Sequence, residues 1–208
     1  MLPVTQYIIR RLAPDLLGRV TRILYGGKNL SFGKNFKCEG IPRIMIDRSA
    51  KISFGDNVYL RRNVEIRAHK NSFISIGNNT RLDKAIRLLA NNKATVEIGD
   101  NSRLGLNTVL NGGDDIIIGE NTLISGFVYL QSSMHNHKTN KSIIDQGYSH
   151  QPISIGKDSW LGAHAVIMPG IQLPNGTVVG SNAVVTKSPE KENSILAGVP
   201  AKEIKERS

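Results

Sequence analysis

Three of the five histidines in this 208-residue sequence lie in one short stretch, residues 132–151. His135 and His137 stand two residues apart in the segment SSMHNHK, and alternate residues of an extended segment face the same side. Histidine suits proton transfer near neutral pH because its unperturbed pKa is about 6.5. The pair predicts a general base, either His135 or His137. His150 and His69 are expected at the surface.

The chain from Ser31 onward repeats a hexad that must position these histidines. ISFGDN, ISIGNN, VEIGDN, IIIGEN and ISIGKD are variants of one unit, and its aliphatic residue returns every six positions. Period six fits neither an amphipathic helix nor a simple alternating strand. It predicts a solenoid in which three hexads complete one triangular coil and the coils stack on one another. The 20 glycines and 18 asparagines suit corners with positive φ, and Cys38 falls on an inward position.

One coil carries an insertion that contains the histidines. The first coils start 22 residues apart, at Phe32, Phe54, Ile76 and Ile98. The step from Ile118 to Ile155 is 37 residues, which leaves a 19-residue insertion over about 132–151. Because a uniform solenoid needs no such loop, and loops on rigid scaffolds often carry function, this segment is the expected active-site loop.

Residues 1–30 lie outside the repeat and read as a basic amphipathic helical segment, interrupted before Pro14. Its apolar residues recur every four positions, at Val4, Ile8, Leu12, Leu16, Val20 and Leu24. Two interpretations stay open: a cap over the open end of the solenoid, or a contact with a membrane surface. Residues 31–188 form the predicted solenoid, and 189–208 are expected to form a loop and a short basic tail helix.

Composition narrows the class of partner. Lys and Arg number 27 against 17 Asp and Glu, and the formal net charge of +10 favours an anionic partner. Aromatic residues make up only 5%, which argues against nucleic-acid binding by base stacking. No apolar run reaches the length of about 18 residues needed to span a membrane, and no signal peptide is evident. We expect a cytoplasmic protein, peripheral at the inner face of the membrane if residues 1–30 contact lipid.

The hexads from Ile52 to Lys187, the run WLGAHAVIMPGIQLPNGTVVGSNAVVTK and the ending ILAGVPAKEIKER resemble the hexapeptide-repeat O-acetyltransferases. The branch that modifies surface polysaccharides and related sugars is the most similar. The resemblance covers about residues 31–207. It implies a left-handed parallel β-helix, a homotrimer with active sites between subunits, acetyl-CoA as donor and a saccharide as acceptor.

The resemblance also implies roles for individual residues. The catalytic histidine of the family lies where His135 lies. Trp160 falls beside the cofactor arm near the reacting centre, and further positions line that arm or the nucleotide phosphates: Ala163, Ser181, Thr186, Lys187, Lys202 and Lys205. Phe127 stands where galactoside acetyltransferases carry a sugar-binding asparagine. This departure puts a simple galactoside acceptor in doubt, while Phe127 and His137 remain the expected contacts to the substrate.

Acetyl transfer to a hydroxyl needs a base and a slot that holds both substrates in line. No covalent nucleophile is evident, because Cys38 points inward and no nucleophile-elbow motif is present. We therefore expect direct attack on acetyl-CoA with His135 as base. The sequence does not name the group that orients His135, and its candidates are Asp114, Asp115 and Asp145.

Three alternatives use the same scaffold. The nearest is N-acetylation of an amino sugar or an antibiotic. A zinc enzyme of the γ-type carbonic anhydrase class is disfavoured because His135, His137 and His164 lack its ligand spacing, so no metal is expected. A non-enzymatic β-helix scaffold would explain the repeat, but would leave the loop histidines and the cofactor-like ending without a role.

Overall fold

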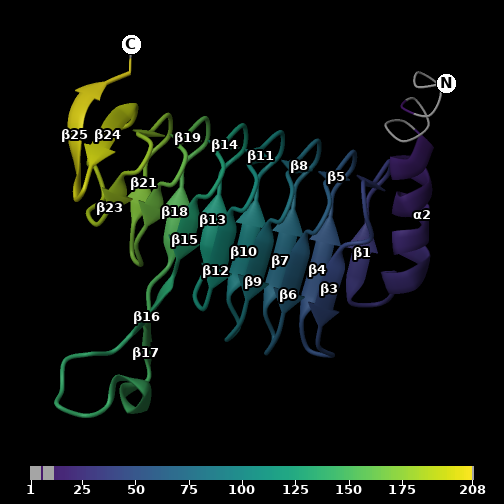
Figure 1. Cartoon of the computed structure of the whole chain (residues 1–208), viewed down its shortest axis with the longest axis horizontal. Coiled ribbons are helices and arrows are strands. Elements are labelled where there is room, and N and C mark those ends of the chain that lie inside the picture. The colour runs from purple at the N-terminus through teal and green to yellow at the C-terminus, as the bar shows by residue number, and fades with distance from the viewer. Residues whose placement is uncertain (1–5, 7–11, 208) are drawn as a thin grey trace.

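The computed structural model describes Gln6 and residues 12–207. Over the repeat, the chain forms an all-β solenoid in which three parallel sheets run along the length of the molecule (Figure 1). The arrangement fits a left-handed parallel β-helix, as the resemblance implies. The part of the predicted N-terminal helical segment in residues 1–5 and 7–11 lies outside the described residues.

Consecutive strands of the chain fall on different sheets. The first sheet contains β1 (Leu30–Phe32), β4 (Lys51–Phe54), β7 (Phe73–Ile76), β10 (Thr95–Ile98), β13 (Ile116–Ile118), β18 (Ile153–Ile155) and β21 (Gln172–Leu173). The second contains β2 (Lys37–Cys38), β5 (Tyr59–Leu60), β8 (Arg81–Leu82), β11 (Arg103–Leu104), β14 (Leu123–Ile124), β19 (Trp160–Leu161), β22 (Val178–Val179), β24 (Ser194–Gly198) and β25 (Ala201–Glu206). The third contains β3 (Arg43–Ile46), β6 (Glu65–Ala68), β9 (Arg87–Ala90), β12 (Val109–Gly112), β15 (Tyr129–Gln131), β20 (Val166–Ile167) and β23 (Val184–Val185).

The hexad aliphatics form the core as ladders across the coils. In the third sheet Leu88 lies opposite Ile66 on one side and Leu110 on the other, and all three are fully buried. Cys38 is buried as well, as its hexad position predicts, and burial raises the pKa of its thiol. The register places inward side chains of neighbouring coils in direct contact, which removes their apolar surface from water.

The corners explain the asparagine content. Most of the non-glycine residues with positive φ are asparagines, and one corner repeats them in successive coils. Their side-chain amides bond along the stack, at 3.1 Å from Asn35 to Asn57, 2.9 Å from Asn57 to Asn79 and 3.1 Å from Asn79 to Asn101. Asparagine tolerates the left-handed conformation and its amide both donates and accepts, so the prediction for the corners is confirmed for asparagine.

The corner prediction is wrong for most of the described glycines, since only Gly147, Gly170, Gly176 and Gly198 have positive φ. A hexad glycine such as Gly55 is needed instead for close stacking, because a Cβ there would lie 2.8 Å from the backbone nitrogen of Asn78 in the next coil.

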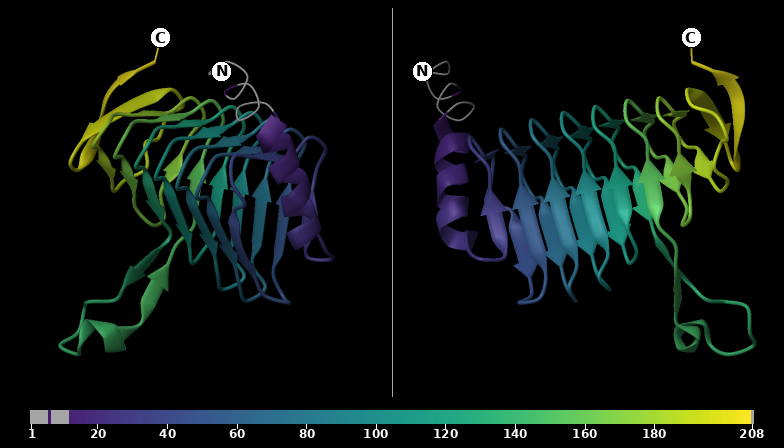
Figure 2. Two further views of the ribbon diagram at one scale, coloured as in Figure 1. Left: turned by 45° about the vertical axis from the view of Figure 1, so that its right-hand side comes forward. Right: turned by 180° about the vertical axis from the view of Figure 1, so that it is seen from behind.

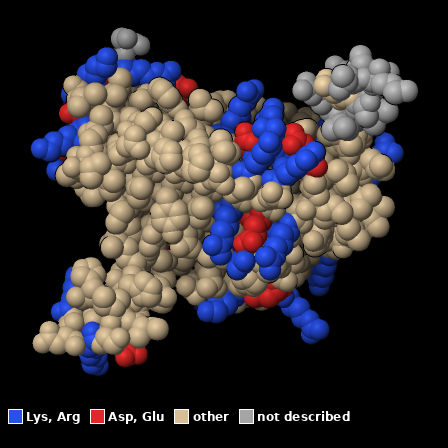
Figure 3. All heavy atoms as spheres, in the orientation of Figure 1, with Lys and Arg blue, Asp and Glu red and all other residues tan. Residues whose placement is uncertain are grey.

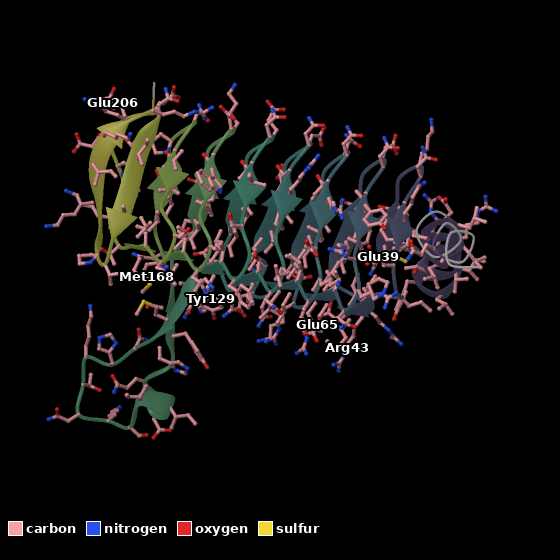
Figure 4. The ribbon with its side chains drawn as sticks, turned by 45° about the horizontal axis from the view of Figure 1, so that its top comes forward. Glu39, Arg43, Glu65, Tyr129, Met168 and Glu206 are labelled. Carbon is pink, nitrogen blue, oxygen red and sulfur yellow. The ribbon has the colours of Figure 1, made fainter. Side chains whose placement is uncertain are left out.

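Charged side chains alternate in sign along the outer face of the third sheet, because residues 22 apart become neighbours. Figure 4 shows Glu65 near Arg43, and their carboxylate and guanidinium lie 3.6 Å apart. Arg87 approaches Glu65 from the next coil at 3.2 Å, and Arg67 lies at 2.6 Å. Burial raises the pKa of Glu65, but the hydrogen bond and charge of Arg67, with the charges of Arg87 and Arg43, outweigh it and lower the pKa below its usual value.

Helix α2 (Ala13–Tyr25) lies across the N-terminal end of the solenoid and packs on β2 (Figure 2). It buries Pro14, Gly18 and Thr21. Thr21 lies 3.3 Å from the sulfur of Cys38. The helix therefore does cover the first coil, through its small residues. Among the described residues, no helix has the length and apolar character that a membrane crossing requires.

The predicted tail helix is wrong, because the C-terminal residues form strands. β24 pairs parallel with β22, and β25 turns back antiparallel along β24. A helix of six residues would have few internal hydrogen bonds, whereas the last coil offers a row of free backbone partners. The hairpin thus closes the C-terminal edge of the second sheet.

One carboxylate has a role at a corner that acid should abolish. The side chain of Asp47 accepts hydrogen bonds from the backbone of Lys70 at 2.7 Å and the hydroxyl of Ser49 at 2.7 Å, besides the backbone of Ser49 and Ala50 at 2.9 Å. The backbone bond from Lys70 is the largest cause of a pKa lowered from 3.8 to about 2.

We predict that Asp47→Ala lowers the melting temperature at pH 7 and that the gap to the wild type closes in acid. The folded pKa is depressed, so the stabilisation is complete above about pH 4 and is lost as pH falls toward 2. Thermal melts across this range check it. Glu97→Ala is the matched control, since the side chain of Glu97 is exposed on β10 and has no hydrogen-bond partner among the described residues. A gap that stays constant down to pH 2 would contradict the assignment.

Candidate active site

The inserted loop is a hairpin that leaves the solenoid directly after β15. Its strands are β16 (Ser133–His135) and β17 (Tyr148–His150), and a short 3-10 helix, η2 (Ile143–Gln146), lies at its far end. Figures 1 and 2 show the hairpin projecting away from the body. The expected loop therefore exists, with a defined strand pairing that fixes which side chains share a face.

One face of the hairpin carries a row of polar and aromatic groups. Ser133 lies opposite His150, and His135 lies opposite Tyr148, so all four side chains share that face. The Ser133 hydroxyl lies 2.8 Å from Nδ1 of His150. The rings of His135 and Tyr148 have centroids 4.2 Å apart, and those of Tyr148 and His150 6.2 Å. His150, expected at the surface, is indeed exposed, and it also joins this row.

His137 lies beyond the end of β16, with Nδ1 3.3 Å from the backbone oxygen of His135. Both histidines line a cavity of about 580 Å³ at the hairpin, together with Asp145. Of the three candidate orienting carboxylates, Asp145 is the one that reaches this cavity. Asp114 and Asp115 instead accept backbone bonds, from Asp115 at 2.8 Å and from Thr95 at 2.6 Å.

A second cavity, of about 520 Å³, lies between the hairpin row and the solenoid. Its lining is mostly polar and comes from both parts: Lys70, Leu89, Asn91, Asn92, Asn111, Gly112, Gly113, Ser133, Tyr148 and His150. Oδ1 of Asn91 is buried and has no hydrogen-bond partner among the described residues. Because buried polar atoms are normally paired, this oxygen favours a hydroxyl or amine donor from a bound molecule.

Gly113 lets the hairpin approach the solenoid. A Cβ at this position would collide with Oγ of Ser133 and would lie 2.9 Å from Nδ1 of His150. The absent side chain therefore makes room for the Ser133–His150 contact.

The residues to which the family resemblance assigns contacts with the cofactor arm lie on the last coils. Trp160, on β19, is 47% exposed and donates its indole N–H to the Ser125 hydroxyl at 3.0 Å. Ala163 and Ser181 occupy the corner after this sheet in successive coils, where the backbone of Asn182 donates to Ala163 at 2.8 Å. They form one continuous edge with the indole.

Phe127 shares that corner one coil earlier and does not reach the hairpin row of its own chain. It stacks on His164 with centroids 4.8 Å apart and planes 6° apart, and both residues have positive φ, at 61° and 60°. Bulky residues seldom adopt this conformation. Phe127 is 45% exposed in this stack, as an aromatic surface rather than a polar contact.

The lysines divide into two groups. Lys187 and Lys202 line one cavity of about 320 Å³ at the C-terminal end, with Lys191 beside them. Lys191 is paired with Glu206 at 2.9 Å. Thr186 precedes Lys187 at the end of β23, and Lys205 lies on β25 outside the lining of this cavity. The structure thus brings Lys187 and Lys202 together and leaves Lys205 apart.

The two halves of the candidate site lie on different sides of one protomer. Trp160 belongs to the second sheet, whereas the hairpin leaves the third sheet. In Figures 1 and 2, β19 and the hairpin lie at opposite edges of the solenoid. A single chain therefore does not bring His135 to Trp160. Within the described part of the chain, no group of three His, Cys, Asp or Glu side chains converges as a metal site.

Comparison with known proteins finds similarity to bacterial transferases. The family model described as bacterial transferase hexapeptide (six repeats) matches residues 152–187. This match covers the C-terminal coils of the solenoid. The chain is 38% identical to the galactoside O-acetyltransferase of Escherichia coli strain K12 over 93 residues, 44% of each protein. It is 36% identical over 102 residues to E. coli WbbJ, provisionally named a lipopolysaccharide biosynthesis O-acetyl transferase, which covers 44% of this chain and 50% of WbbJ. The chain spans half or less of the length of these curated relatives.

Solved structures extend the similarity of fold over most of the chain. The polySia-specific acetyltransferase NeuO superposes with a TM-score of 0.68 at 22% identity, covering 86% of this chain and 82% of NeuO. A mutant of AntD, an N-acyltransferase from Bacillus cereus in complex with dTDP and coenzyme A, gives a TM-score of 0.62 at 25% identity, covering 86% of this chain and 84% of AntD. These likenesses confirm the fold that the hexads predict.

We predict that Gly113→Ala destabilises the protein by about 1–3 kcal/mol, because the added Cβ overpacks the base of the hairpin. Chemical denaturation measures the loss. Gly27→Ala is the control, since a Cβ at Gly27 meets nothing within 4 Å. Equal losses in the two variants would show that the close approach at Gly113 has no energetic weight.

Proposed function

We propose that this chain transfers an acetyl group from acetyl-CoA to a hydroxyl of a saccharide, in the biosynthesis of a surface polysaccharide. The observation that carries the proposal is the hairpin row, in which Ser133, Tyr148 and His150 line a polar cavity and His135 packs on Tyr148, on a scaffold shared with acetyltransferases. The printed names of the galactoside enzyme and WbbJ supply the acceptor class.

The acceptor would lie in the cavity between the hairpin and the solenoid. Asn91, Asn92 and Asn111 present amides there, and the unpaired Oδ1 of Asn91 would accept a hydrogen bond from a sugar hydroxyl. Lys70 lines the same cavity and would favour an acceptor that carries a carboxylate or phosphate. His137, at the mouth of the hairpin cavity, and Phe127, from a neighbouring protomer, are the further substrate contacts we propose.

His135 would act as the general base. Its imidazole takes the proton of the acceptor hydroxyl as that oxygen attacks the thioester carbonyl, and later returns the proton to the departing thiolate. Tyr148 packs on the ring from one side, with centroids 4.2 Å apart, and Asp145 is the carboxylate in the lining of the cavity that His135 also lines. No covalent enzyme intermediate is needed, since the only cysteine lies buried beneath α2.

Acetyl-CoA would lie along the edge formed by the last coils. Trp160, with its indole fixed by Ser125, would border the thioester end, and Ala163, Ser181 and Thr186 would line the pantetheine arm. Lys187 and Lys202 would face the nucleotide phosphates, with Lys205 as an outer charge. The AntD structure at 25% identity contains coenzyme A, which supports a coenzyme A donor.

The donor and acceptor halves require a second protomer. Because the hairpin and the Trp160 edge lie on different sides of one chain, we expect a homotrimer in which each hairpin faces the edge of its neighbour.

An amine in the acceptor cavity would react by the same route, so an amino sugar or antibiotic is the second candidate. The similarity to AntD, which is named an N-acyltransferase, supports this second candidate. Hydroxylamine distinguishes the two candidates, because it cleaves the acetyl ester of an O-acetyl product and leaves the amide of an N-acetyl product intact.

We predict that His135→Ala lowers kcat by about 100-fold or more, the usual contribution of a positioned base, while acetyl-CoA binding and subunit assembly persist. Acetyl transfer to bacterial polysaccharide fragments measures turnover, and calorimetry measures binding. His69→Ala, at a solenoid corner, is the control. Undiminished activity in His135→Ala would refute the mechanism, and a loss confined to His137→Ala would move the role to that residue.

We predict that Lys202→Ala raises the KM for acetyl-CoA by about tenfold with kcat nearly unchanged. A lost charge-assisted contact to a phosphate remote from the reacting bond weakens the ground and transition states equally. Steady-state kinetics at varied acetyl-CoA provide the measurement, with Lys51→Ala, exposed on β4, as the control. A fall in kcat at constant KM would contradict the phosphate assignment.

A further inference from the structure

Helix α2 packs Leu17 and Tyr25 against the core but presents its other large apolar side chains away from the protein. Leu12, directly before the helix, is 55% exposed, and Leu16, Ile23 and Leu24 are 63%, 82% and 61% exposed. At 100° per residue, Leu12, Leu16 and Ile23 fall on one stripe, with Val20 and Leu24 at its edge. The buried residues, Pro14, Gly18 and Thr21, fall on the opposite side. We call the stripe of Leu12, Leu16, Val20, Ile23 and Leu24 the outer stripe.

This orientation is the reverse of an ordinary surface helix, which buries its apolar stripe. The reason lies at Gly18, where a Cβ would collide with the backbone oxygen of Phe36 and would lie 3.1 Å from Cα of Lys37. Only small residues allow so close an approach. The outer stripe therefore has no role in holding the helix to its own solenoid.

Basic side chains border the outer stripe. Arg19, within the helix, and Lys28, just after it, are exposed, and so are Lys34 and Arg48 of the first coil. The acidic residue of the helix, Asp15, is neutralised by Lys37 at 2.9 Å. The end of the molecule therefore combines an exposed apolar band with basic side chains that form no ion pair with any described residue.

The geometry places this band on an outer end of the molecule. The helix lies across the solenoid rather than along it, so its outward face forms the N-terminal end (Figure 2). In Figure 3 that end is mostly free of charged atoms apart from scattered basic groups. A flat surface could contact the whole stripe at once.

We propose that α2 docks the N-terminal end of the protein on a bilayer that contains anionic phospholipid. The outer stripe enters the boundary between headgroups and acyl chains, and Arg19 and Lys28 reach the phosphates. Each basic group near such a surface adds attraction, which the positive border supplies. A symmetric contact between two copies would instead oppose two like-charged borders. The inference stands independently of acetyl transfer.

Vesicle flotation of the full chain tests the proposal. The probes are phosphatidylcholine vesicles with and without phosphatidylglycerol. We expect binding to the anionic vesicles that weakens with added salt, and little binding to neutral ones. Ile23→Glu should lower the partition coefficient about tenfold or more by placing a charge in the stripe, and Arg19→Glu should lower it too.

Ile204→Glu is the matched control, because Ile204 is 61% exposed on β25 at the other end of the solenoid and should keep wild-type binding. Ile23 is exposed, so its variants should retain the wild-type melting temperature, and Ile23→Gln tests the stripe without a charge. Undiminished vesicle binding by Ile23→Glu, or equal binding to neutral and anionic vesicles, would overturn the proposal. The proposal would also be overturned if Ile23→Glu kept its affinity for vesicles but formed a smaller oligomer than the wild type. The stripe would then be a contact between copies of the chain.

Discussion

Each coil of this protein depends on the coils beside it for its backbone hydrogen bonds and for the burial of its inward side chains. The same bond repeats from coil to coil, from Gly55 to Ile76 at 2.7 Å, from Gly77 to Ile98 at 2.8 Å and from Gly99 to Ile118 at 2.8 Å. A residue inserted within a strand would break this register. An insertion at a corner does not, which is why a 19-residue hairpin fits between β15 and β18 while Ile153 still donates to Asp115 at 2.8 Å.

That constraint also decides where chemistry can lie. The interior is filled by aliphatic ladders, so functional groups are confined to outer faces, corners and the hairpin. The hairpin row and the Trp160 edge fall on different sides of one chain, and a rigid solenoid cannot bend to join them. Assembly of protomers is the remaining way to complete a site that needs both, which links oligomerisation to catalysis in the function we propose.

The period of the hexad was sufficient to predict the core, the corners and the position of the insertion, because each depends on residue type and spacing alone. The pairing within the hairpin was not predictable in this way. Ser133, Tyr148 and His150 become neighbours of His135 only through an antiparallel register that no repeat encodes. Gly113 was the one residue whose type could have indicated this pairing, because the absence of a side chain there leaves room for the Ser133–His150 contact. The C-terminal strand was missed because its stability comes from the open edge of β22 and β24, not from its own sequence.

The N-terminal helix shows a further limit of pattern analysis. Periodicity identifies an apolar stripe but not its direction, because the stripe is defined relative to the helix axis and not to the neighbouring coil. Gly18 settles the direction: a glycine inside a helix costs about 1 kcal/mol relative to alanine, and here a Cβ would strike the backbone of Phe36. The contact face must therefore be the one that carries Pro14, Gly18 and Thr21, with Leu17 packed at its side, and Leu12, Leu16 and Ile23 must face outward. Part of the +10 charge lies beside them, so the sequence features that fit a cap and those that fit a membrane contact belong to opposite faces of one helix.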